Sequence, residues 1–256
     1  MYNVLSLNKS AVKAHLKKMD GIAHDLANVN THGYKRKEVN FEEVRIRQIN
    51  GEVLKSQNAQ DLSLNMGTKA GITKNTFSQG AITPSNEKFN MAISGEGFFG
   101  VRDGNGNLML TRNGSFHQNE NGSVSDELGN TLDMDTFLPF DRWTGDIVIS
   151  KTGEISTLEN DERVMLGQVV LYKPDNPHDL ISIGESGFVL KNGAGLTTSD
   201  GGEGFGDINQ YFLEESNAEV SRSMVDMITT QRAYSMNAKA LQTTDEIMTM
   251  INGIKR

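Results

Sequence analysis

The C-terminal stretch from about Asn217 to Ile254 constrains the fold more than any other part of the chain. It contains no Pro, and its only Gly is Gly253. Its apolar residues are spaced alternately four and three positions apart, interrupted at Gln231 and Asp245. This spacing is typical of a helix that packs along another helix through a narrow apolar seam. About 35 residues at 1.5 Å each make a rod of roughly 50 Å, so the predicted helix needs a partner of similar length.

The N-terminal stretch, from about Asn3 to Asn28, offers that partner. From Val12 onward its apolar residues repeat the spacing of four and three. We therefore expect the two ends of the chain to pair as antiparallel helices that carry an inserted body. The alternative is that each helix packs separately against the middle of the chain. The predicted seam residues are Leu5, Val12, Leu16, Met19, Leu26, Val220, Met224, Met227, Ile228, Leu241 and Met248.

Between the two helices the sequence pattern changes twice. Residues 41–82 show no sustained period and are expected to form an extended, mobile connection. From Phe89 onward, apolar residues alternate with polar ones, and Gly- and Asn-rich turns follow about every 8 to 12 residues, as in an antiparallel β domain. Phe98 and Phe99 are predicted to anchor its core. The strand candidates include 108–111, 115–118, 124–126, 146–150, 154–157, 164–172 and 186–190.

The predicted fold class is therefore α+β, with long terminal helices paired as a coiled-coil-like stem and an inserted antiparallel all-β body. The predicted domains are a stem of residues 1–40 and 212–256, a connection of residues 41–82 and a β-rich body of residues 83–211.

Composition excludes several classes of function. The chain has no Cys, which excludes disulfides, thiolate metal sites and Cys nucleophiles. Its formal net charge of −8 argues against a general nucleic-acid binder. No apolar run is long enough to span a bilayer, so we expect no membrane insertion. The N-terminus also lacks the apolar core and cleavage site of a secretory signal peptide.

The chain shows no catalytic constellation and no cofactor or metal motif. Asp103, Asn105 and Asn107 resemble the start of a calcium loop, but Leu108 stands where that loop needs Gly, and the closing Glu is missing. We interpret these residues as a hairpin turn. Adjacent carboxylates such as Glu214 and Glu215 are expected on the surface rather than in an acid–base pair. The sequence therefore predicts a protein that is not an enzyme.

Three stretches carry a family resemblance. They are DLANVNTHGYKR at 25–36, ISGEGFFGV at 93–101 followed by TRNGSF at 111–116, and the stretch LEESNAEVSRSMVDMITTQRAYSMN at 213–237. In this order they resemble the signature segments of bacterial flagellar rod and hook proteins. The chain departs from the family pattern at His24-Asp25, where the family has Asn-Asn, at Ala218, where it has Val, and at Ser223, where it has Glu.

The resemblance implies an axial structural protein at the flagellar basal body, outside the cytoplasm. It implies export through the flagellar apparatus without a cleaved signal, and helical assembly into a tube with copies of itself and other rod or hook proteins. The distal rod members are most similar; a proximal rod or hook-type paralogue is the alternative. The motif residues expected to make subunit contacts are Leu26, Ala27, Asn28, Asn30, Thr31, Gly33, Tyr34, Lys35, Ser216, Asn217, Gln231, Arg232, Ala233, Tyr234 and Asn237.

A rival interpretation from another class is a secreted surface-binding β module with a helical stalk. Such a module needs an exposed aromatic or polar binding face. The chain's single Trp, Trp143, is the only sign of one.

Overall fold

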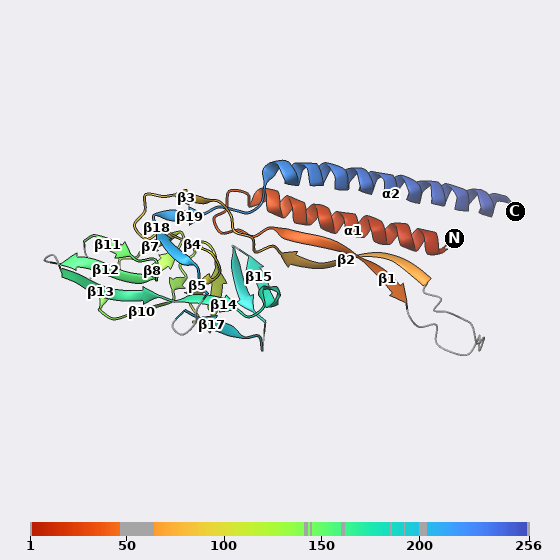
Figure 1. Ribbon diagram of the computed structural model, residues 1–256. Coiled ribbons are helices and arrows are strands. Elements are labelled where there is room, and N and C mark those ends of the chain that lie inside the picture. Colours follow the sequence, from red (N-terminus) through yellow and green to blue (C-terminus); the bar gives the residue numbers. More distant parts are fainter. Residues whose placement is uncertain are drawn as a thin grey trace. The chain divides into compact units, whose positions relative to one another are not determined.

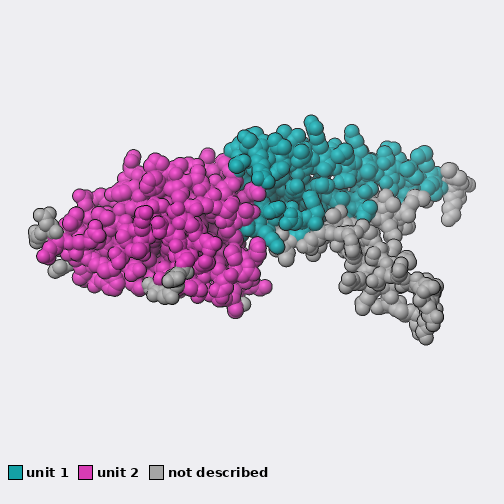
Figure 2. All heavy atoms as spheres, in the orientation of Figure 1, with its two compact units in different colours: residues 1–27, 37–75, 219–256 teal, residues 28–36, 76–218 magenta. Residues whose placement is uncertain are grey.

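The computed structural model describes residues 2–46, 64–140, 143, 145–159, 162–184, 186–191, 193–199 and 204–254. The chain divides into two compact units (Figure 2). Unit 1 comprises Met1–Ala27, Lys37–Asn75 and Glu219–Arg256, and unit 2 comprises Asn28–Arg36 and Thr76–Ala218. Both ends of the sequence therefore belong to unit 1.

Unit 1 contains the two terminal helices, α1 (Tyr2–Ala27) and α2 (Val220–Ile254). They contact each other and run antiparallel, so that the two termini lie at the same end of the pair (Figure 1). The predicted C-terminal helix is confirmed. At 26 residues, α1 is shorter than the 35 residues of α2. Within the described residues, no helix is long and apolar enough to cross a lipid bilayer.

A long strand pair completes unit 1. Strands β1 (Lys37–Ile46) and β2 (Leu64–Asn75) are antiparallel, and α1 contacts both. Ala14 of α1 packs against Val39 of β1, and the Asp25 carboxylate accepts a hydrogen bond of 3.0 Å from the Lys37 N–H. The helix therefore covers one face of the strand pair.

This strand pair differs from the extended connection expected for residues 41–82, which contain the second half of β1 and all of β2. The register of β1 and β2 shifts twice, between Val39 and Phe41 and between Glu43 and Arg45. Each shift interrupts the alternation that identifies a strand in a sequence, which explains the weak pattern. Residues 47–63 of the expected connection lie outside the described residues.

Unit 2 is an antiparallel β structure, which confirms the predicted all-β body. Its main sheet is nine-stranded, with the order β15-β16-β6-β5-β9-β8-β7 and with β14 pairing β5 and β17. A four-stranded sheet has the order β10-β13-β12-β11, and two short ladders join β18 to β4 and β19 to β3. The strands are β3 (Ile82–Pro84), β4 (Met91–Ser94), β5 (Phe98–Arg102), β6 (Leu108–Thr111), β7 (Phe116–Gln118), β8 (Val124–Asp126), β9 (Thr131–Leu132), β10 (Met134–Thr136), β11 (Ile147–Ile149), β12 (Glu154–Glu159), β13 (Glu162–Val169), β14 (Leu171–Pro174), β15 (Leu180–Gly184), β16 (Gly187–Leu190), β17 (Leu196–Thr198), β18 (Asp207–Gln210) and β19 (Phe212–Glu214).

Most strand candidates from the sequence correspond to a strand, but the candidate at 164–172 is two strands. The chain leaves β13 after Val169 and enters β14, which pairs with β5 in the other sheet. The interpretation of Asp103 as part of a turn is confirmed. Its carboxylate accepts hydrogen bonds from the N–H groups of Asn105 and Asn107, at 2.9 and 2.8 Å, between β5 and β6.

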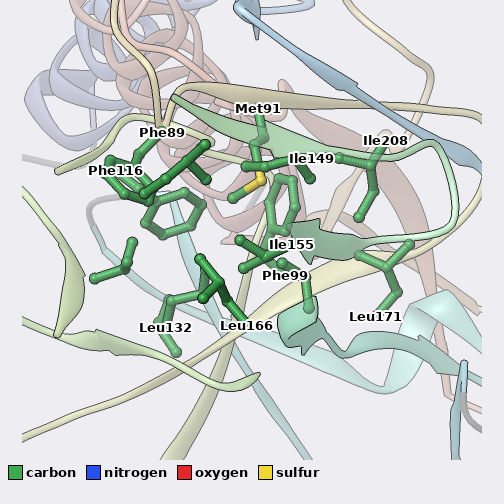
Figure 3. Packing of buried hydrophobic residues seen from close by; sticks show 14 of the residues in the cluster. Phe89, Met91, Phe99, Phe116, Leu132, Ile149, Ile155, Leu166, Leu171 and Ile208 are labelled. Atoms are coloured by element: carbon green, nitrogen blue, oxygen red, sulfur yellow. The ribbon is translucent and has the colours of Figure 1, made fainter. Parts of the chain in front are cut away.

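Two apolar clusters form the core of unit 2. Phe99 is fully buried in the larger cluster, together with Met91, Ile155 and Leu166 (Figure 3). Phe98 is buried in the smaller cluster, because successive residues of a strand point to opposite faces of the sheet.

Trp143 is also buried in the larger cluster, and its Nε1–H donates a 3.3 Å hydrogen bond to the Leu138 carbonyl. Trp143 is therefore not part of an exposed aromatic binding face, and the surface-binding interpretation loses its only sign.

Candidate functional site

Residues from the three sequence motifs meet in unit 2 around the carboxylate of Glu214. Glu214 ends β19 in the C-terminal motif, Lys35 belongs to the N-terminal motif, and Arg112 follows β6 in the TRNGSF stretch. The side chains of these three residues are at most 6% exposed. We call Lys35, Arg112 and Glu214 the ionic junction.

Each carboxylate oxygen of Glu214 forms an ion pair with one cation. Lys35 Nζ lies 2.5 Å from Oε1, and Arg112 Nη1 lies 3.2 Å from Oε2. The Gly80 N–H also donates to Oε1, at 2.9 Å. A buried charge is tolerated only when it is paired and hydrogen-bonded, and the Glu214 carboxylate meets this condition.

Backbone carbonyls accept further hydrogen bonds from both cations. Lys35 Nζ donates to the Ser78 carbonyl at 2.9 Å, and Arg112 Nη2 donates to the Gly95 carbonyl at 2.7 Å. The Arg112 guanidinium also lies over the ring of Phe98, 5.2 Å from its centroid, in a cation–π contact. The junction therefore joins five separate segments of the chain.

Two cations share a single anion in the junction. Burial lowers the pKa of Lys35 below its usual value, and the nearby Glu214 carboxylate opposes this shift. Burial likewise lowers the pKa of Arg112, against the same opposing carboxylate, yet a guanidinium stays protonated in proteins. With all three groups ionised, the junction holds an excess of one positive charge, so Glu214 is the member on which both partners depend.

Gly33 allows the N-terminal motif to pack closely against the junction. Its φ is +68°, in the region that favours glycine. Its N–H donates a 2.8 Å hydrogen bond to the backbone carbonyl of Glu214. A Cβ at this position would overlap the backbone of Arg112 and Asn113. Position 33 therefore requires glycine, because the backbone of the TRNGSF stretch lies too close to leave room for a side chain.

Asn217 ties the C-terminal motif to two other segments. Its Oδ1 accepts a hydrogen bond from the Arg36 N–H at 2.7 Å, and its Nδ2 donates to the carbonyls of Thr76 and Ser78 at 2.7 and 3.0 Å. Its own N–H donates to the Tyr34 carbonyl at 3.3 Å. The segment that precedes α2 is thus bonded to the segment that precedes β1.

The structure brings some of the predicted motif residues together at the ionic junction. Gly33, Tyr34, Lys35 and Asn217 lie at or next to the junction, and the Ser216 hydroxyl accepts a 3.2 Å bond from the Ala218 N–H. The other motif residues do not join them. Leu26 and Ala27 end α1, Asn28 and Thr31 form the following turn, Asn30 is exposed, and Gln231, Arg232, Ala233, Tyr234 and Asn237 lie on α2 in unit 1.

Sequence reasoning missed the two residues that complete the junction. Glu214 was expected on the surface beside Glu215, and this expectation is wrong because Glu214 is fully buried while Glu215 is exposed. The two carboxylates point to opposite sides of the chain as β19 ends. Arg112 lay within a quoted motif, but nothing in the sequence pairs it with a carboxylate about 100 residues away.

On α2, the least exposed residues form a stripe that overlaps the predicted seam only at Met227, Leu241 and Met248. Among its members, Ser223 and Thr230 are buried, whereas Met227, Tyr234, Asn237, Leu241, Thr244 and Met248 are half-buried. Their spacing is again four and three, but apolar residues alternate with small polar ones. The hydroxyls of Thr230 and Thr244 donate to the carbonyls four residues earlier, at 2.6 and 2.7 Å. Both hydroxyls therefore have their hydrogen-bond partners within α2. This stripe faces α1, the element that α2 packs against.

The part of the α2 surface that faces away from this stripe also carries exposed apolar side chains, mainly near the two ends of the helix. The predicted seam residues Val220, Met224 and Ile228 lie on this side, and Ile228 is 51% exposed. We call this side the outer face of α2; it comprises Val220, Met224, Val225, Ile228, Met236, Ile247, Met250 and Ile251. On α1, Val12, Met19 and Leu26 are half-buried, Leu16 is exposed, and the side chain of Leu5 is outside the described part.

Both chain ends lie in unit 1, where the terminal helices contact each other, and the buried charges of the junction are paired within the chain, which is an organisation suited to a structural protein. The chain belongs to the bacterial flagellar basal-body rod and hook protein family. Two family models match it: the flagellar basal body rod FlgEFG protein C-terminal region at residues 209–254, and the flagellar hook protein FlgE/F/G D1 domain at residues 92–157.

Similar proteins cover the chain from end to end. The flagellar basal-body rod protein FlgG of Borreliella burgdorferi is 32% identical over 100% of both chains. FlgG of Buchnera aphidicola subsp. Acyrthosiphon pisum is 31% identical over 95% of this chain and 96% of the relative. The flagellar hook-basal body complex protein FlhP of Bacillus subtilis is 28% identical over 93% of each.

Proposed function

We propose that this protein is a structural subunit of the flagellar rod that polymerises helically into a torque-transmitting tube. The observation that carries the proposal is the outer face of α2. Its apolar side chains include Met236, which is 66% exposed, and Ile228. Apolar side chains that are exposed at both ends and in the middle of one helix mark a contact surface, and another side of α2 already contacts α1.

The partner that we propose for the outer face is a helix of similar length, which a second copy or a close relative provides. A contact between two different surfaces of identical subunits does not close on itself and produces a helical filament. We propose that α1 and α2 pair as a coiled coil within each subunit. The exposed Gln231 and Arg232, next to the outer face, then contact the neighbouring copy.

The tube has two layers in this proposal. The helical stem formed by the chain ends, predicted as residues 1–40 and 212–256, makes the inner layer, and the β-rich body of residues 83–211 makes the outer layer. Export through the flagellar apparatus without a cleaved signal places the subunits outside the cytoplasm. The similarity to proteins named FlgG supports the distal rod, with a proximal rod or hook-type paralogue as the alternative.

Replacing Ile228 by Asp tests the proposal. The substitution should stop polymerisation because it puts a charge into the contact between copies. The isolated subunit should keep its thermal stability, since surface substitutions usually change the free energy of unfolding by less than about 0.5 kcal/mol. Sedimentation of polymer from purified subunits measures the first effect, and thermal unfolding measures the second.

The matched control is Ile228→Leu, which keeps the side chain apolar and of equal volume and should polymerise like the unchanged protein. Normal polymerisation of the Asp variant would show that the outer face is not the contact between subunits.

A further inference from the structure

Helix α2 carries much of the sulfur in this protein. The chain has 12 Met and no Cys, so every sulfur atom is a thioether. Five of the 12 lie in α2, namely Met224, Met227, Met236, Met248 and Met250. Peroxides oxidise a thioether to a sulfoxide. Because the chain has no thiol, no cysteine competes with these methionines for an oxidant.

The methionines of α2 divide into two groups by exposure. Met224, Met236 and Met250, on the outer face, are 51%, 66% and 61% exposed. Met227 and Met248 lie on the stripe that faces α1 and are half-buried. The three outer methionines are the most exposed of those whose side chains the structure describes.

The methionines of unit 2 are better shielded. Met91 is fully buried in the larger apolar cluster, and Met109 and Met134 pack against that cluster. Met165, on β13, is 40% exposed. Since an oxidant must reach the sulfur, exposure governs how readily a methionine is oxidised. We therefore expect an oxidant to modify the outer face of α2 before the core of unit 2.

We propose that Met224, Met236 and Met250 are the sites at which a hydroperoxide oxidises the free subunit. The sulfur lone pair attacks the terminal oxygen of the O–O bond, which breaks. That oxygen stays on the sulfur, and its proton moves to the departing oxygen, which leaves as water or an alcohol. The sulfur is oxidised by two electrons, and the peroxide is reduced by the same two. Each step turns an apolar side chain into a polar one.

The modification also affects assembly, and this part of the inference rests on the proposed function. A methionine buried in a contact stabilises it through its apolar surface, whereas a sulfoxide oxygen buried there lacks a hydrogen-bond donor. One buried sulfoxide should therefore raise the critical concentration for polymerisation by about tenfold or more. Oxidation thus blocks free subunits, whereas the contact itself shields subunits that are already in the polymer.

The order of oxidation tests the sites without any polymer. Hydrogen peroxide is added to the purified subunit, and peptide mass spectrometry follows the sulfoxide at each methionine. The three outer methionines should react first. Met91 should react about a thousandfold more slowly, because it is reached only when unit 2 opens, and folded domains outnumber their open states by about 10³ or more. Oxidation of Met91 or Met227 before the outer methionines would overturn the assignment.

A variant with leucine at all three positions is the matched control for assembly. Met224→Leu, Met236→Leu and Met250→Leu conserve apolar volume, so the triple variant should polymerise like the unchanged protein. After peroxide treatment, the critical concentration should rise by at least about tenfold for the unchanged protein and stay constant for the variant. Methionine sulfoxide reductases supplied with a dithiol reductant should restore polymerisation of the oxidised protein.

Thermal unfolding of the oxidised subunit should match that of the untreated one, since the added oxygens are exposed. An equal rise in critical concentration for both proteins would assign the effect to another residue, such as Met165, and the inference for assembly fails. It also fails if the sulfoxide form polymerises like the untreated protein. If the unchanged protein does not polymerise at all, the proposed function fails, and the order of oxidation still decides whether the three methionines are the sites.

Discussion

Replacing Glu214 by Gln is expected to lower the free energy of unfolding of unit 2 by about 3–5 kcal/mol, the usual loss when one partner of a buried ion pair is removed. Gln keeps the size of the side chain but leaves Lys35 and Arg112 as two buried cations without an anion. Urea unfolding followed by the fluorescence of Trp143, the only Trp and a core residue of unit 2, measures the loss.

Removing a cation should cost less than removing the anion. Lys35→Met leaves Glu214 paired with Arg112, so the remaining junction is charge-balanced. The loss should be about 1–3 kcal/mol, mainly for the hydrogen bonds to buried partners. A control at the surface is Asp207→Asn, in the exposed pair of Asp207 with Lys151 at 3.7 Å, for which no measurable change is expected. A larger loss for Lys35→Met than for Glu214→Gln would contradict our account of the junction as two cations that depend on one carboxylate.

Replacing Gly33 by Ala should be the second large effect. A left-handed backbone costs a residue with a Cβ about 1–2 kcal/mol, and forcing an atom into a packed site costs about 1–3 kcal/mol more. We therefore expect a loss of about 2–5 kcal/mol in total, measured by the same unfolding experiment. The added Cβ meets backbone atoms of Arg112 and Asn113, which cannot move aside as a flexible side chain would.

Two other glycines separate the two causes. Gly129 has a φ of +85° and open space around its Cβ position, so Gly129→Ala should show the backbone strain alone. Gly104 has open space and no positive φ, so Gly104→Ala should be close to neutral. Equal losses for Gly33→Ala and Gly129→Ala would mean that the close approach of the first and second motifs contributes nothing.

The prediction of the seam shows why a local pattern is insufficient for a helix with two apolar sides. Counting apolar residues placed Met224 and Ile228 on the stripe that pairs with the other helix. The structure places Ser223 and Thr230 there instead and leaves Met224 and Ile228 exposed. The spacing of four and three was correct, but two neighbouring stripes share that spacing, and only the contact with α1 distinguishes them.

The sequence by itself determined the elements whose cause is local. The terminal helices, the short strands and the turn at Asp103 follow from residue spacing and from turn residues, because those preferences act within a few positions along the chain. The motifs that identify the family can likewise be recognised directly in the amino-acid sequence.

The tertiary structure alone decided which distant residues meet. The pairing of β1 with β2, the burial of Glu214 beside Lys35 and Arg112, and the close approach of Gly33 to Arg112 all depend on segments far apart in sequence. A buried charge or a strained backbone is stable only in the presence of its partners, and no short stretch of sequence contains them.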